Sequence, residues 1–445
     1  MRKLCRPAPG WGLLDRASVT LLEPRDADDL RDWLASDTSG PVGARGLGRS
    51  YGDAASGARM LLTRPLRQVW DLDADRGLLR AGAGWSLGEL TARTLPFGWA
   101  PVVLPGTRHV TLGGAIAADV HGKNHHVEGA FCRHVDTLHV LGADGQVREC
   151  SREILPDLFA ICCGGMGLAG LVLDVTLRLA RRRGDHFRRR TLACADLDSA
   201  LLALRQATES HTVAWVDAAS DGHALGRALV YLGEPVDAPD HAPRTHGENA
   251  VPTPHMGLCV VRPALMRAFN AAVWMGGRRR HGREDLQHYA SFFWPLDVLA
   301  DWNRLYGLTG LLQFQCLLPD ELLARRGAAP FMELLRLFQS ARGGALAVMK
   351  TMGSRDEATA SIAFPGPGVT LAVDLPATPA GRAAVRRANR LAADWGGRVY
   401  LAKDALLEPA EFAAMCPELP AWRALRERWD PQRRWVTDLS LRLDL

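Results

Sequence analysis

The chain has 445 residues, of which 47% are hydrophobic and 23% charged, and its formal net charge is +5 at pH 7. This length predicts two or three domains, and the composition is that of a globular protein. The sequence contains no run of about 18 apolar residues, so no membrane span is predicted. The basic clusters at 181–183, 188–190 and 278–280 are short and lack interleaved aromatic residues, which disfavours nucleic-acid binding. The nine cysteines form no CxxC pair, so we expect reduced, buried thiols. The N-terminus has no apolar h-region, and no signal peptide is predicted.

The first 150 residues alternate short strand-like and helix-like segments. Residues 26–35 place Leu30, Trp33 and Leu34 on one helical face. The stretch 78–97 is typical of a strand, a glycine turn and a helix with Ser86 as N-cap and Glu89 three residues on. Residues 134–150 form two alternating runs around a turn, the pattern of a β-hairpin.

The composition changes at the arginine-rich stretch 181–190, where we expect a domain edge. The following block, up to residue 397, alternates strands and helices with long connections, which predicts an α+β layer with an antiparallel sheet. Its predicted strands are 211–219, 226–233, 310–319, 346–353, 360–368 and 369–376, and its predicted helices 196–207, 330–341 and 378–397. The remaining tail is predicted to be mostly helical.

Three glycine-rich loops, 43–52, 105–114 and 164–170, follow one another in this first part of the chain. None matches the Rossmann fingerprint or a Walker A loop. Glycine lets the backbone approach a ligand closely and leaves N–H groups exposed to an anion such as phosphate. Together the loops indicate an extended cofactor contacted from several sides, whereas each alone is also compatible with a tight turn.

Several polar residues are candidates for chemistry. His121 and His125 have the spacing of a metal pair on a helix, but no carboxylate or cysteine stands at ligand spacing, so we predict no metal site. Lys403 follows a short apolar strand and is either a surface lysine or a pocket lysine that deprotonates a hydroxyl. Gln313 and Gln315 share one strand face, which suits sugar hydroxyls or an exposed strand.

Five motifs occur together along nearly the whole chain: "GLGRSYGDAA", "LPGTRHVTLGGAIAADVHGKNHHVEGAF", "GGMGLAGLVLDVT", "FFWPLDVLADWNRLYG" and "YLAKD". With them the chain resembles the vanillyl-alcohol-oxidase type of FAD-dependent oxidoreductases (PCMH-type FAD binding), and within it the decaprenylphosphoryl-β-D-ribose 2-oxidase branch. The resemblance implies an α+β fold: a split, two-part FAD-binding domain with an inserted α+β substrate domain built on an antiparallel sheet. The implied boundaries are 1–185 for the first part of the FAD domain, 186–397 for the substrate domain and 398–445 for the segment that completes the FAD domain.

The resemblance implies FAD as cofactor, held non-covalently because Arg49 matches the position where some relatives carry a flavin-linking histidine. The pyrophosphate would meet backbone N–H groups of residues 46–50. The implied cofactor-binding residues are Arg45, Gly46, Leu47, Gly48, Arg49, Ser50, Tyr51, Pro105, Gly106, Thr107, Thr111, Gly113, Gly114, Ala117, His121, Gly122, Gly129, Gly167, Gly170 and Tyr400.

The implied reaction is oxidation of a secondary sugar hydroxyl by hydride transfer to flavin N5. The implied catalytic residues are Lys403, His121 and Tyr51. The implied substrate-binding residues are Lys123, Trp215, Arg304, Gln313, Gln315 and Lys350. Ala372 stands where the mycobacterial members have an active-site cysteine, and Thr370 replaces a polar amide, so the sugar pocket is expected to differ there.

The resemblance also implies partners: a sugar or prenyl-phosphate-sugar substrate and an NADH-dependent short-chain reductase for the keto product. The expected location is the cytoplasm, with peripheral contact at the inner membrane as an open alternative. Candidate contact segments are the loop 235–258 and the segment 278–296 with Phe292, Phe293 and Trp294. Two other functions stay open: an aldonolactone oxidase acting on D-arabinono-1,4-lactone with oxygen, and a non-catalytic flavin- or metal-binding scaffold.

Overall fold

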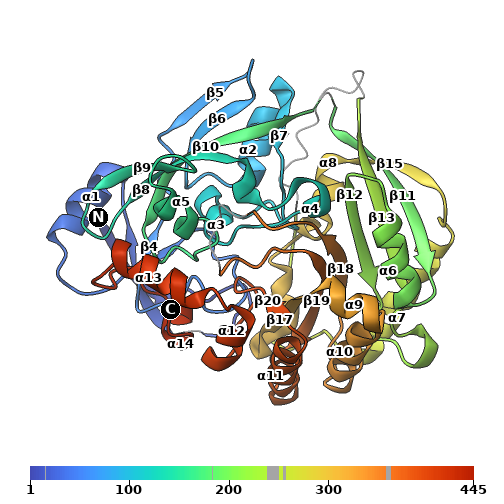
Figure 1. The fold of residues 1–445 in the computed structure, drawn as a ribbon. Helices are drawn as coiled ribbons and strands as arrows, with labels where there is room; N and C mark the ends of the chain where they lie inside the picture. The colour runs from blue at the N-terminus through green and yellow to red at the C-terminus, as the bar shows by residue number, and fades with distance from the viewer. Residues whose placement is uncertain (16, 183, 238–249, 254–256, 357–361) are drawn as a thin grey trace.

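The computed structural model describes residues 1–15, 17–182, 184–237, 250–253, 257–356 and 362–445. Figure 1 shows two regions side by side. One contains the N-terminal strands, coloured blue to teal, together with the red C-terminal helices. The other contains a large sheet formed by the middle of the chain.

Two sheets form the N-terminal region. In the four-stranded sheet, with order β1-β2-β4-β3, β4 runs parallel to both β2 and β3. In the six-stranded sheet, with order β5-β6-β10-β8-β9 and β7 beside β10, every pairing is antiparallel. The strands are β1 (Arg2–Pro7), β2 (Ser18–Glu23), β3 (Gly43–Arg45), β4 (Arg59–Leu62), β5 (Trp70–Asp73), β6 (Leu78–Gly82), β7 (Trp99–Pro101), β8 (Val135–Leu141), β9 (Val147–Ser151) and β10 (Leu171–Arg181).

The local signals in this region are confirmed. Leu30 and Leu34 are the buried residues of α1, Ser86 and Glu89 form a capping box at the start of α2, and β8 pairs with β9 as a hairpin. The helices of the region are α1 (Ala27–Ser36), α2 (Leu87–Thr94), α3 (Leu112–Ala117), α4 (His125–Glu128) and α5 (Pro156–Cys162), with the 3-10 turns η1 (Leu95–Phe97) and η2 (Phe131–His134).

The middle of the chain forms an eight-stranded sheet with order β15-β11-β13-β12-β18-β19-β17-β20, and all its pairings are antiparallel, as predicted. Its strands are β11 (His186–Cys194), β12 (His211–Val216), β13 (Ala228–Val236), β15 (Glu284–His288), β17 (Leu311–Leu318), β18 (Ala347–Met352), β19 (Gly368–Pro376) and β20 (Arg398–Val399). A separate parallel pair joins β14 (Val251–Pro252) and β16 (Leu299–Ala300).

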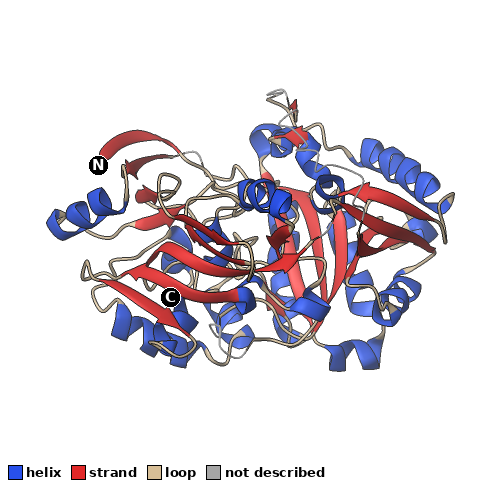
Figure 2. Cartoon of the chain, turned by 90° about the horizontal axis from the view of Figure 1, so that it is seen from above, coloured by secondary structure: helices blue, strands red, loops and turns tan. Residues whose placement is uncertain are grey.

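Helices flank these strands (Figure 2). They are α6 (Leu197–Gln206), α7 (Pro263–Arg278), α8 (Tyr289–Phe293), α9 (Asp320–Arg326), α10 (Ala329–Ser340) and α11 (Pro379–Asp394), with the 3-10 turns η3 (Gly222–Ala224), η4 (Pro295–Val298) and η5 (Trp302–Thr309). The three predicted helices are therefore confirmed, and Gly396, with φ of +69°, follows the end of α11.

The strand predicted at 360–368 is wrong. Residues 360 and 361 lie outside the described residues, and the described part from 362 to 367 forms no strand, so β19 begins only at Gly368. Pro365 and Pro367 explain the difference, because proline has no N–H to donate to a neighbouring strand.

The aromatic residues proposed to face a membrane are buried instead. Phe292, Phe293 and Trp294 expose only 5%, 3% and 7% of their surface. Phe187 stacks on Phe292 with ring centroids 4.3 Å apart, and Phe293 packs edge-on against the same ring. These aromatic side chains form part of the core, so they are not available to a bilayer. Most of the other proposed loop, residues 238–249 and 254–256, lies outside the described residues.

The C-terminal segment returns to the N-terminal region. It contains α12 (Pro409–Met415), α13 (Leu419–Trp429) and α14 (Asp438–Arg442), as the helical prediction requires. Arg434 pairs with Asp37 at 2.6 Å, and Arg442 pairs with Asp53 at 2.7 Å and with Asp404 at 2.8 Å. The pairs with Asp37 and Asp53 join residues 397 and 389 positions apart in the sequence.

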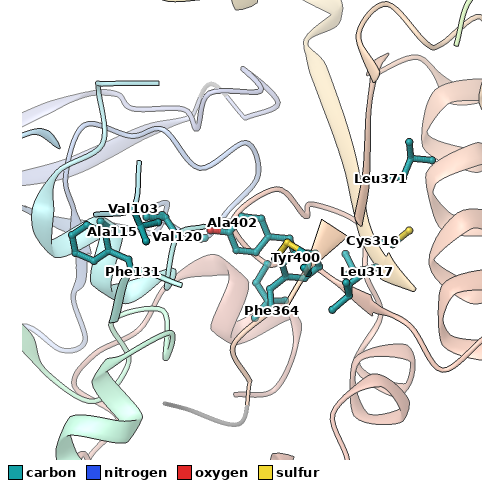
Figure 3. Close-up of a cluster of buried hydrophobic side chains, with 14 of the residues drawn as sticks. Val103, Ala115, Val120, Phe131, Cys316, Leu317, Phe364, Leu371, Tyr400 and Ala402 are labelled. Carbon is teal, nitrogen blue, oxygen red and sulfur yellow. The ribbon is translucent and has the colours of Figure 1, made fainter. Parts of the chain in front are cut away.

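The two regions share a continuous apolar core. Figure 3 shows Tyr400 and Ala402 between side chains of the N-terminal region, such as Val120, and those of the large sheet, such as Leu371.

Seven of the nine cysteines are buried, but Cys5 is exposed. Within the described ranges, no helix has both the length and the apolar character needed to cross a bilayer.

We expect the Arg442→Ala substitution to destabilise the fold by about 3 kcal/mol, because it removes the ion partner of the buried Asp404 carboxylate. Urea unfolding followed by circular dichroism measures this loss. The matched control is Arg428→Ala, whose side chain is 62% exposed in its pair with Asp157 and should contribute less than about 1 kcal/mol. Equal effects of the two substitutions would contradict the assignment.

Candidate functional site

A cavity lies between the three glycine-rich loops and the large sheet. It brings together residues that the sequence places in six separate segments. The predicted residues that line it are Gly46, Leu47, Gly48, Arg49, Ser50, Tyr51, Pro105, Gly106, Thr107, Thr111, Gly113, Gly114, Ala117, His121, Gly167, Gly170, Gln313, Gln315, Lys350, Tyr400 and Lys403.

The loop 46–50 offers backbone donors to this cavity. Within the described part of the chain, none of its five N–H groups donates a hydrogen bond. Gly48 has φ of +64°, which turns the loop in a way that favours glycine. Successive N–H groups in such a turn form an anion-binding concavity, so the loop fits a pyrophosphate.

Arg45 does not line the cavity; its side chain instead packs against the loop 46–50. Its guanidinium donates to the carbonyls of Ala55 and Pro9, both at 2.7 Å. A Cβ at Gly48 would lie 2.2 Å from Arg45 Nη2, so a side chain there would displace the guanidinium from its present position.

The other two glycine loops also present bare backbone. Among the described residues, and apart from the chain neighbours of each glycine, a Cβ atom at Gly106 or Gly167 would meet no atom within 4 Å, although both residues line the cavity. At Gly46, by contrast, a Cβ would lie 2.2 Å from Thr111 Oγ1, so this glycine lets two of the loops touch. The unpaired donors and this glycine-lined wall fit FAD, which combines an anionic centre with flat ring systems.

Arg49 lies at the border of the cavity. Its guanidinium stacks on Trp11 with 4.1 Å between Cζ and the ring centroid, and its buried Nε has no hydrogen-bond partner among the described residues. Burial lowers its pKa, while Asp301 and Asp297 raise it. A cationic group that is short of partners is suited to an anionic or carbonyl oxygen of a ligand.

Lys403 and Asp374 form the buried ionisable centre of the site. Lys403 Nζ lies 3.9 Å from the centroid of the Tyr51 ring. The side-chain amide of Gln313 donates to Asp374 and also to the Tyr51 hydroxyl, the latter at 3.3 Å. Burial lowers the pKa of Lys403 to about 8, although Asp374 acts in the opposite direction. Burial also raises the pKa of Asp374 to about 7.

A second polar group surrounds His121. Lys350 Nζ donates to His121 Nδ1 at 2.7 Å, and the Gln315 amide lies 3.2 Å from Nε2 and 3.1 Å from Thr370 Oγ1. Burial, and then the charge of Lys350, lowers the pKa of His121 well below its ordinary value, so the ring is neutral. Burial also lowers the pKa of Lys350 to about 7.

The use of lysine supports a role in proton transfer. Only four of the 54 basic side chains are lysines: Lys3, Lys123, Lys350 and Lys403. Two of the four line the cavity. Arginine cannot be deprotonated in a protein, whereas a buried lysine can accept a proton near neutral pH. This contrast was a usable sequence signal that motif reasoning overlooked.

Besides Arg45, five predicted residues do not line the cavity: Gly122, Lys123, Gly129, Trp215 and Arg304. Lys123 Nζ instead donates to the Phe292 carbonyl and lies 4.4 Å from the Phe292 ring centroid. Arg304 pairs with Asp301 at 2.9 Å and is 42% exposed. Their charges are therefore already used elsewhere.

The other three are backbone or packing positions. The Gly122 carbonyl accepts a hydrogen bond from Lys350 at 3.2 Å, and Gly129 ends α4 with φ of +72°. Trp215 is buried and pairs across the sheet with Val348, which itself lines the cavity. It is thus one strand away from the cavity wall.

Sequence reasoning missed other lining residues, among them Trp11, His109, Leu296 and Trp302, and it missed Asp374 behind them. A carboxylate within the apolar strand "VTLAVDLP" was a signal for Asp374, because a buried charge needs a partner. The tryptophans carry no such signal, since tryptophan is usual in any core.

His121 and His125, the two histidines with the spacing of a metal pair, lie close together in the structure. The rings of His121 and His125 have centroids 6.4 Å apart. Among the described residues, no group of three or more His, Cys, Asp or Glu side chains could hold a metal ion.

Comparisons with known proteins identify the family of the chain. Residues 20–151 match the model of the FAD binding domain. The chain is 32% identical to decaprenylphosphoryl-β-D-ribose oxidase of Mycolicibacterium smegmatis, across 98% of this chain and 97% of that protein. It is 29% identical to L-gulonolactone oxidase of Mus musculus and 26% identical to cytokinin dehydrogenase 3 of Arabidopsis thaliana, in matches that span 35% and 36% of this chain. The chain is therefore an FAD-dependent oxidoreductase and belongs to the decaprenylphosphoryl-β-D-ribose oxidase family.

Proposed function

We propose that this enzyme oxidises a secondary hydroxyl of a pentose carried on a prenyl phosphate. The observation that carries the proposal is the convergence of Lys403, Lys350, Gln313, Gln315 and His121 at one wall of the FAD cavity. Amide side chains suit sugar hydroxyls, an ammonium group suits an anionic substrate, and a neutral amine can accept the hydroxyl proton. The relative that matches over nearly its whole length carries such a substrate in its name.

Bound FAD supplies the acceptor for the hydride that leaves the sugar carbon. The protein's task is to remove the hydroxyl proton and to hold the sugar. We assign the proton to Lys403 Nζ, because its pKa of about 8 leaves a fraction of neutral amine at neutral pH. Asp374 stabilises the ammonium that results, since its charge favours the protonated form of Lys403.

The remaining side chains orient the substrate. Gln313 is tied to Asp374 and Tyr51, so its amide is held in place before substrate binds. His121 stays neutral and is held between Lys350 and Gln315, which keeps its ring orientation fixed. In this arrangement Lys350 provides the positive charge for the phosphate of the substrate.

For the architecture, we propose the division at 1–185, 186–397 and 398–445, with the last segment completing the FAD domain. Its support is the set of C-terminal contacts with Asp37 and Asp53, and the change from β10 to β11 between residues 181 and 186. The FAD contacts would come from the glycine loops and from Tyr400, whose hydroxyl donates to the Ala118 carbonyl at 3.1 Å.

We also propose that the keto product passes to an NADH-dependent short-chain reductase, which would complete an epimerisation. The enzyme would work in the cytoplasm with peripheral contact at the inner membrane, where a prenyl-linked sugar resides.

The substrate class can be tested by anaerobic flavin reduction with purified enzyme. We expect a polyprenyl-phosphate pentose to bleach the oxidised flavin, because both lysines and the amides then have partners. Free aldonolactones, such as D-arabinono-1,4-lactone, should leave it oxidised. Rapid bleaching by the lactone alone would favour the aldonolactone-oxidase alternative, and no bleaching by any sugar would contradict the enzymatic role.

The role of Lys403 predicts a pH dependence. Its ammonium loses the proton above a pKa of about 8, so the rate of flavin reduction should rise between pH 7 and 9. Lys403→Met should retain FAD but lose at least about 100-fold in this rate and lose the pH-dependent rise. Stopped-flow absorbance at several pH values measures both.

The matched control is Lys403→Arg, which keeps the positive charge but cannot accept a proton. It should be as slow as Lys403→Met. A normal rate in the arginine variant would mean that Lys403 acts through charge alone and would contradict its role as proton acceptor.

The cofactor should be bound non-covalently, because Arg49 offers no nucleophile to the flavin. Acid precipitation should leave the FAD in the supernatant, and denaturing gels should show no flavin fluorescence in the protein band. A fluorescent band would contradict this assignment.

A further inference from the structure

The solvent side of α7 is apolar. Leu265, Phe269 and Met275 expose 55%, 54% and 53% of their surface. With Ala268 and Ala272 between them, they follow helical spacing along one side of α7. We call this side the α7 face. Asn270 is the only residue of α7 that is fully buried, so the helix lies on the surface of the molecule.

The segment that contains α7 carries charge of one sign, although Arg267 pairs with Asp221 from another segment at 3.4 Å. Between Cys259 and Arg283 the sequence contains six arginines and neither aspartate nor glutamate. Arg278, Arg279 and Arg280, at the C-terminal end of α7, are exposed, and no ion pair within the described residues involves them. An amphipathic surface helix with exposed leucine and phenylalanine and flanking arginines has the character of an interfacial membrane helix.

The α7 face belongs to the side of the sheet that carries the site. Val348 lines the cavity and pairs with Trp215, which pairs in turn with Leu229. Residues in register on neighbouring strands point to the same face of a sheet. A Cβ at Gly277 of α7 would come within 2.2 Å of Leu229, so α7 covers the continuation of this face.

Two more exposed apolar residues lie in and beside η5, the 3-10 segment that reaches the cavity. Leu258 and Leu308 are 71% and 63% exposed. They are joined by the hydrogen bond from the Leu308 N–H to the Gly257 carbonyl at 3.2 Å. Leu308 belongs to η5, and Trp302 at the start of η5 lines the cavity.

We propose that the α7 face docks this enzyme on an anionic lipid bilayer. The exposed leucines and phenylalanine enter the interface and the arginines at 278–280 contact anionic headgroups. The purpose of the docking rests on the proposed lipid-linked substrate: the prenyl chain stays in the bilayer while the sugar reaches the cavity on the same side of the sheet. A bilayer fits better than an acidic protein, because the stripe of exposed residues on the α7 face is apolar and contains no charged side chain with which an acidic partner could pair.

The test is co-sedimentation of the purified, FAD-loaded enzyme with vesicles of phosphatidylcholine, with and without phosphatidylglycerol. We expect binding to the anionic vesicles and at least a tenfold weaker partition coefficient for the Leu265→Glu/Phe269→Glu variant. The Arg279→Gln/Arg280→Gln variant should lose about tenfold or more, since each arginine near an anionic surface contributes about a fivefold factor. High salt should weaken the binding of the wild type.

The matched control is Leu202→Glu on α6, where the leucine is 56% exposed and lies outside the α7 face; its binding should equal that of the wild type. Thermal melting and circular dichroism verify that the variants are folded. Wild-type enzyme that ignores anionic vesicles, or an α7 variant that binds them as well as wild type, would overturn the proposal. A dimer of the wild type would also overturn it, if sedimentation velocity shows that the Leu265→Glu/Phe269→Glu substitutions dissociate this dimer and if the wild type does not bind vesicles.

Failure of docking is distinguishable from failure of the proposed function. Flavin reduction of the wild type by a short-chain, water-soluble prenyl-phosphate pentose, without vesicles, reports on the site alone. Reduction without vesicle binding would overturn only the docking proposal.

Discussion

The site depends on the contact between the loop 46–52 and the turn that carries Lys403. The Tyr51 N–H donates to the Ala402 carbonyl at 2.9 Å. Gly52 lies so close to this turn that a Cβ would be 1.9 Å from the Asp404 carbonyl oxygen. Arg442 then pairs with both Asp53 and Asp404, so a single guanidinium holds the loop and the turn together. If this contact loosened, the backbone donors and the lysine would lose their fixed separation.

Burial sets the chemistry that this contact positions. The cavity wall removes water from Lys403, Lys350 and His121, and each has a lowered pKa for that reason first. The neutral imidazole of His121 accepts from Lys350 at Nδ1 and is thereby held in one orientation, while a lysine with a pKa near neutrality can exchange a proton. The protein uses arginine almost everywhere else, where a permanent charge is sufficient. The two lysines that line the cavity therefore stand at positions where a charge that can change is useful.

In the large sheet, successive side chains of each strand point to opposite faces, and this alternation connects the cavity with other parts of the molecule. On β17, Gln313 and Gln315 line the cavity, while Phe314 and Cys316 between and after them belong to the core. The same alternation carries the cavity face across β18 and β12 to β13, where α7 covers it. One sheet thus links the amides of the site to a helix whose outer side is apolar and basic.

Local signals in the sequence determined the elements. Capping at Ser86, the hairpin turn after Leu141 and the glycine after α11 each act within a few residues, so they could be predicted. The prolines at 365 and 367 were equally local, and they were underweighted in predicting a strand at 360–368. Most of the predicted site residues, the glycine loops among them, line the cavity, and they were predicted through motifs that occur along the whole chain.

Tertiary structure decided which charged side chains face the cavity. The sequence alone placed Lys123 and Arg304 beside Lys403 as candidates, but packing turned Lys123 toward Phe292 and paired Arg304 with Asp301. Packing also brought Asp374 close enough to Lys403 to influence its pKa. The aromatic residues 292–294 became buried, whereas the outer side of α7 stayed exposed. Residue type and spacing determine an element and its faces, because those are fixed within a few peptide bonds. The direction of a long side chain and its pKa depend on neighbours that only the folded chain brings together.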